Sequence, residues 1–102
     1  MSRPFIIVFN SLVGEAALVQ SALDSMPEVT HWFRCFPHAI FFTSTKSANE
    51  LATKLRSKLG VGVPGDKRFV VLQVSSAEAQ GWLPPAAWHL IQNPGSPVFP
   101  QK

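Results

Sequence analysis

The pattern of apolar and polar positions predicts four β-strands. An unbroken apolar run lies at residues 5–9, and further runs rich in β-branched and aromatic side chains lie at residues 29–36, 39–44 and 68–75. A two-residue Pro-His turn separates the second and third runs, so these two strands are expected to form a hairpin.

Two helices are predicted between these strands. Apolar positions on one helical face predict a helix over residues 15–26, which Pro27 ends. The second helix has a marked start, because Ser47 and Glu50 form a capping box. Gly60 is its expected C-cap.

The resulting order, βαββαβ, is typical of an α+β ferredoxin-like sandwich with an antiparallel sheet in the spatial order 4-1-3-2. In the first strand Ile7 points to one face of the sheet, while Ile6 and Val8 point to the other. Two helices cover one face, so the C-terminal segment or a second copy of the chain must cover the second. Exposing several such side chains costs roughly 1.5–3 kcal/mol each. We therefore expect a homodimer packed sheet face to sheet face.

The chain divides into a domain with a C-terminal aromatic extension, residues 1–92, and a Pro-rich tail, residues 93–102. In the extension a short helix is expected to open at Pro85 and to pack on a sheet edge or on a partner subunit. The tail contains three prolines and is expected to be flexible.

Composition narrows the class of protein. The 102 residues form one core-rich domain, with 46% hydrophobic and 15% charged residues. The net charge of +3 is compatible with an anionic partner. A single cysteine, Cys35, excludes an intramolecular disulfide and favours a reducing compartment. No apolar run has the length of a membrane span, and no secretory signal is expected, so the predicted location is the cytoplasm.

Several stretches together resemble a known group of small dimers. They are "FIIVFN", Trp32 in the second strand, "AIFFTSTKSANEL", "RFVVLQV" and the aromatic extension, within residues 4–91. The layout resembles the ferredoxin-fold dimers around the smaller universal CRISPR adaptation protein, with the virulence-associated protein D toxins as relatives. The resemblance implies dimerisation through sheet faces, often with exchange of C-terminal strands, and a defence, toxin–antitoxin or mobile-element setting.

The end of the first strand departs from that group. Its nuclease members place a metal-binding aspartate there, and this chain has Asn10. A neutral amide is a poorer ligand than a carboxylate for a hard divalent cation. The nearest carboxylate in sequence, Glu15, lies in the predicted helix. No catalytic or metal-binding residue is therefore expected.

The predicted topology gathers a candidate anion or nucleic-acid site at one end of the sheet, near the start of the first helix. Its members are Asn10, Ser11, His38, Lys67 and Arg68. Amide and cationic groups beside a helix N-terminus suit an anion such as phosphate. The alternative is that the two cations are solvated loop residues and that the asparagine caps a turn.

Aromatic side chains offer a second candidate surface. Most of them are expected in the core or in the dimer interface, but some could contact a partner or stack on bases. The candidate partner-contact residues are Trp32, Arg34, Trp82 and Trp88.

Other chemistry-bearing patterns are weaker. His31, Cys35 and His38 have a suggestive spacing, but structural zinc sites usually need four ligands. "GVGVPG", residues 60–65, has the letters of a dinucleotide fingerprint, but it follows a helix and leads into a strand, the reverse of that motif's context. Neither a metal nor a cofactor is expected.

Three functions remain open. The first is a non-catalytic homodimeric protein that binds nucleic acid or another protein. The second is a weak metal-dependent ribonuclease of the same fold that works without the aspartate. The third is an inhibitor or adaptor that acts only by protein contact.

Overall fold

The computed structural model describes residues 2–14, 16–60, 67–75 and 77–94. The predicted order of strands and helices is confirmed, and a third helix follows the last strand. The elements are β1 Arg3–Phe9, α1 Ala16–Asp24, β2 Val29–Phe36, β3 Ala39–Ser44, α2 Ala48–Leu59, β4 Phe69–Gln73 and α3 Pro85–Gln92.

The strands form one antiparallel sheet in the order β2-β3-β1-β4. This order confirms the predicted α+β fold of the ferredoxin-like type. In the central strand β1, Ile7 lies opposite Ile40 of β3 and Val71 of β4. These three side chains are buried on one face, where they form part of the main hydrophobic core.

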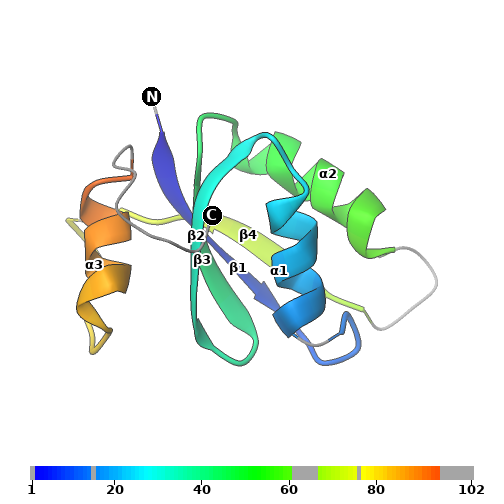
Figure 1. The fold of residues 1–102 in the computed structure, drawn as a ribbon, viewed down its shortest axis with the longest axis horizontal. Helices are drawn as coiled ribbons and strands as arrows, with labels where there is room; N and C mark the ends of the chain where they lie inside the picture. The colour runs from blue at the N-terminus through cyan, green and yellow to red at the C-terminus, as the bar shows by residue number, and fades with distance from the viewer. Residues whose placement is uncertain (1, 15, 61–66, 76, 95–102) are drawn as a thin grey trace.

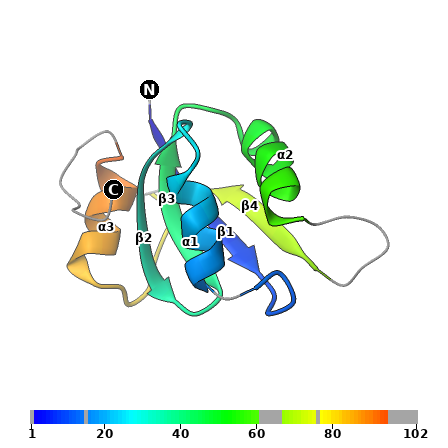
Figure 2. The ribbon, with the colours of Figure 1, turned by 45° about the vertical axis from the view of Figure 1, so that its right-hand side comes forward.

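Helices α1 and α2 cover this first face of the sheet (Figure 2). Ser47 is the N-cap of α2, as predicted: the Glu50 N–H donates to Oγ of Ser47 at 3.2 Å, and that hydroxyl donates to Oε1 of Glu50 at 3.2 Å. Gly60 ends the helix with φ 67°, a left-handed conformation that glycine adopts without steric cost. Leu51 and Leu55 are the fully buried residues of the predicted stripe.

Helix α3 lies on the opposite side of the sheet from α1 and α2 (Figure 1). It begins at Pro85, as predicted, and its buried residues Leu90 and Ile91 form a second core with Phe41 of β3. Its contacts run across β1, β2 and β3, so it covers part of a sheet face rather than an edge. The C-terminal segment thus supplies one of the two coverings expected for the second face.

Some of the sequence predictions fall outside the described residues. They are most of the "GVGVPG" loop and the greater part of the Pro-rich tail. Within the described ranges, no helix is both long and apolar enough to cross a membrane.

Candidate binding surfaces

Asn10 joins the end of β1 to the start of β4. Its backbone N–H donates to the carbonyl oxygen of Arg68 at 3.0 Å. Its side-chain Oδ1 accepts the Arg68 N–H at 3.1 Å. The backbone N–H and the side-chain oxygen of Asn10 therefore both hold the end of β1 to the start of β4. This is a structural role.

The other members of the predicted anion site lie at the same end of the sheet. The His38 carbonyl accepts the Phe9 N–H at 3.0 Å, and its ring meets the Phe9 ring edge-on at 5.8 Å. Ser11 is exposed in the turn that precedes α1, whose first residue is Ala16. The predicted topology thus brings Asn10 and His38 to one end of the sheet, together with the start of β4.

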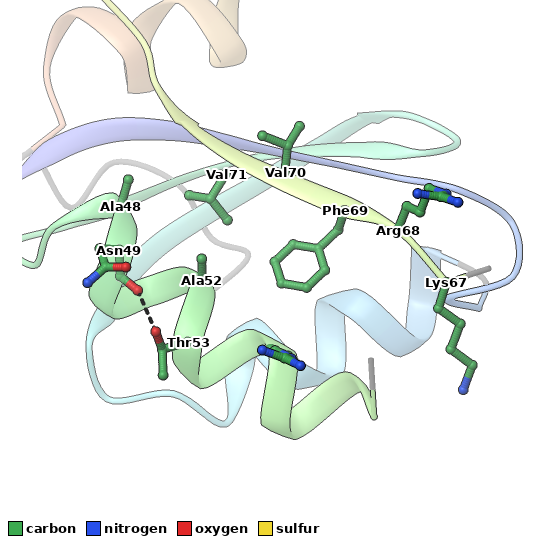
Figure 3. Close-up of a pocket in the computed structure, with 10 residues that line it drawn as sticks. Ala48, Asn49, Ala52, Thr53, Lys67, Arg68, Phe69, Val70 and Val71 are labelled. Atoms are coloured by element: carbon green, nitrogen blue, oxygen red, sulfur yellow. Dashed lines mark hydrogen bonds between the residues drawn. The ribbon is translucent and has the colours of Figure 1, made fainter. Parts of the chain in front are cut away.

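Lys67 and Arg68 are both exposed, but their side chains extend in different directions (Figure 3). Successive residues of an extended chain face opposite sides of a sheet. Lys67 therefore shares a side with Phe69 and Val71, which face α2. Arg68 shares a side with Val70, which faces away from α2 (Figure 3).

The second face of the sheet is only partly covered. Val8 and Val70 are directly opposite each other, and Leu72 is opposite Ile6. Beyond the reach of α3, the exposed fractions are 40% for Val8, 47% for Val70 and 51% for Leu72. We call Val8, Val70 and Leu72 the open strip. It is an exposed apolar surface on the face that the sequence predicts for dimerisation.

The predicted partner-contact residues lie in four different settings. Trp82 is 99% exposed, in the segment between β4 and α3. Trp88 is half-buried in the second core. Trp32 is half-buried against the main core, and its Nε1 donates to Oδ1 of Asp24 at 3.4 Å. Arg34 is exposed on β2. Trp82 is thus the most available of these side chains to a partner.

A groove of about 740 Å³ lies between α2 and β4 (Figure 3). Phe69 and Val71 point from the strand toward Ala48 and Ala52 on the helix (Figure 3). The described lining residues include three basic residues, Arg56, Lys67 and Arg68, and no carboxylate; of the three, Arg68 turns its side chain away from α2 (Figure 3). The sequence interpretation missed this groove. Its signal was present in two small residues four positions apart on α2, beside a strand predicted to lie at an edge.

The backbone of β4 is open on the side away from β1. The Arg68 carbonyl accepts from Asn10, and the Val74 N–H donates to the Pro4 carbonyl at 2.9 Å. Backbone groups of an antiparallel strand alternate in direction, so residues 69, 71 and 73 direct their N–H and C=O away from β1. Among the described residues, no strand pairs with this outer side.

Among the described residues, Cys35 and Glu28 have shifted pKa values. Burial raises the pKa of the Cys35 thiol. A hydrogen bond from the Lys54 ammonium, 2.8 Å away, lowers the pKa of Glu28. In the part of the chain that the structure describes, no three His, Cys, Asp or Glu side chains come together as a metal site would require.

The chain matches no protein-family model, no curated protein and no solved structure. No family is therefore identified, and the structure supports the architecture alone: an α+β fold with a four-stranded antiparallel sheet in βαββαβ order.

Proposed function

We propose that this protein is a non-catalytic, homodimeric binding protein that engages a protein partner. The observation that supports the proposal is the open strip, which leaves three large apolar side chains of one sheet face in water. Burying each of them is worth up to about 1.5–3 kcal/mol. A second copy that brings its own strip gives a self-complementary interface of the kind found in two-fold dimers.

The hydrogen bonds of Asn10 support the absence of catalysis. Its Oδ1 already accepts the Arg68 N–H, and it stands where the resembled nucleases carry a carboxylate. A metal-dependent ribonuclease is the competing function. If purified protein cleaves RNA in Mg²⁺ and folded Asn10→Ala protein does not, the proposal is lost.

Light scattering at micromolar concentration tests the dimer. The wild-type protein is expected to have twice the mass of the chain, and Leu72→Glu is expected to be a monomer. Leu18→Glu is the matched control, because Leu18 has the same 51% exposure on α1, which covers the other face. A monomeric wild-type protein, or equal behaviour of the two variants, contradicts the dimer.

Nucleic acid is the second candidate partner, and the observation that favours it is the cationic lining at Arg56, Lys67 and Arg68. Replacing Lys67 and Arg68 together by alanine would weaken an RNA or DNA complex, and the complex of the unmodified protein would weaken steeply with salt. Binding that is insensitive to salt favours the protein partner. The defence, toxin–antitoxin or mobile-element setting follows from the resemblance, and the neighbouring genes test it.

A further inference from the structure

The groove between α2 and β4 combines three features that suit one kind of ligand. Its strand wall is the open edge of β4, where residues 69, 71 and 73 direct their backbone groups outward. Its floor is apolar, with Phe69, Val71 and Ala52 facing one another (Figure 3). Its described charged residues are all cations.

The edge of β4 suits an extended polypeptide. A strand added there pairs its own N–H and C=O groups with those of Phe69, Val71 and Gln73. The added residues alternate in direction, so every second side chain enters the groove. The helix wall carries the small residues Ala48 and Ala52, which leave room for side chains of modest size such as valine or threonine.

The charges indicate which polypeptide fits. Helix α2 and strand β4 run in opposite directions (Figure 2). Arg56 lies in the last turn of α2 and Lys67 lies just before the first residue of β4, so both lie toward the same end of the groove. Carboxylates of a ligand at that end find cations and no described acidic side chain. A second copy of this chain at the edge would bring an equally cationic groove against this one, which disfavours self-pairing.

The chain's own tail is also a poor occupant. It contains Pro94, Pro97 and Pro100. Residues 97 and 100 are an odd number of positions apart, so in a strand their backbone groups would face opposite sides. Any added strand that includes both prolines therefore turns the backbone nitrogen of one of them toward β4. That proline has no N–H to donate.

We propose that the groove between α2 and β4 binds an acidic, extended polypeptide segment that adds to β4 as a fifth strand. The inference rests on the proposed function in one respect, that the protein binds another protein. It does not depend on the dimer, because Val8 and Leu72 lie outside the groove lining and Val70, which borders the groove, turns its side chain away from α2 (Figure 3).

Amide NMR of the full-length chain tests the binding mode. The probe is the synthetic peptide acetyl-Asp-Asp-Val-Thr-Val-Thr-Val-Asp-Asp-amide, whose acidic ends serve either strand direction. On saturation, the amides of Phe69, Val71 and Gln73 are expected to become protected from hydrogen exchange. Those of Val70 and Leu72 already face β1 and should change little. Protection without this alternation, or at another site, overturns the proposal.

Matched reagents test the chemistry. The same peptide with lysine in place of aspartate is expected to bind at least about tenfold more weakly. Lys67→Glu is expected to weaken the acidic peptide by about three- to tenfold, whereas Lys58→Glu, the same change on α2 outside the groove lining, leaves it unchanged. Ala52→Leu fills the groove with a good helix former and should abolish binding, and the amide spectrum shows whether it is folded. Equal affinity for both peptides overturns the proposal.

The remaining occupants give different results in the protein without peptide. If the edge amides are already protected and this protection grows with protein concentration, a second copy occupies the edge. If the edge amides are protected and this protection is independent of protein concentration, the chain's own tail occupies the edge. Either result overturns the peptide proposal. Light scattering reports separately on the dimer, so the groove and the proposed homodimer can fail independently.

Discussion

Asn10 and Arg68, 58 positions apart in sequence, are joined by two hydrogen bonds. One bond uses the Asn10 backbone and the other its side-chain oxygen, which substitutes for a backbone acceptor where β1 turns away. Asn10→Ala keeps the first bond and loses the second. We expect its free energy of unfolding to fall by about 0.5–1.5 kcal/mol in urea titration.

A variant that keeps an oxygen at position 10 shows whether the loss of stability comes from the hydrogen bond to Arg68 or from any change of this side chain. Asn10→Asp retains an oxygen acceptor for the Arg68 N–H, so it should stay closer to the wild-type stability than Asn10→Ala. Ser11→Ala, at the exposed neighbouring position, should have little effect. Unchanged stability of Asn10→Ala would contradict the assigned role.

Gly14 lies in the turn between Asn10 and α1, and its backbone has φ 135°. Residues that carry a side chain rarely adopt this conformation. An added Cβ would also meet the end of the exposed Leu18 side chain, which can move aside, so the cost comes mainly from the backbone conformation. Gly14→Ala is expected to lose about 1–3 kcal/mol of unfolding free energy. Gly60→Ala is the comparison, since φ is 67° there and the space is open, and it should lose about 1 kcal/mol. Equal losses at the two positions would contradict this account.

The fold was predictable because its local signals agree with one another. Three local signals each marked a helix boundary to within a few residues. They are the capping-box sequence at Ser47 and Glu50, the stop at Pro27 and the start at Pro85. The position of α3 was not predictable in the same way. Leu90 and Ile91 identify an apolar helix, but no local pattern specifies which surface that helix covers.

The candidate sites were less predictable, since they depend on contacts between distant residues. The topology correctly brought Asn10 and Arg68 together. The sequence could not show that the Asn10 oxygen accepts a backbone N–H. The groove was missed because Ala52 and Val71 are read locally as core residues, and only the packing of α2 beside an edge strand opens a space between them.

Helix α3 is expected to be part of the cooperative fold. Leu90 is buried in the second core, so Leu90→Ala should lower the free energy of unfolding by about 2–4 kcal/mol. Gln92→Ala, at the exposed end of the same helix, should have little effect. Because α3 packs on the sheet of its own chain, the loss measured by denaturant unfolding should be independent of protein concentration. The measurement uses the Leu72→Glu background, which is expected to remove the proposed homodimer. A loss that depends on concentration would place α3 on a partner.

The ion pair between Lys54 and Glu28 should make stability depend on pH. Its hydrogen bond lowers the folded-state pKa of Glu28, so its contribution is present above the unfolded-state pKa, about 4.3, and is lost as pH falls through the folded value. Lys54→Met should therefore lower the melting temperature at pH 7 and match the wild type in strong acid. Lys58→Met removes the same charge from α2 but not this pair, and should show no such convergence. A Lys54→Met deficit of the same size in strong acid as at pH 7 would assign its effect to packing instead of charge.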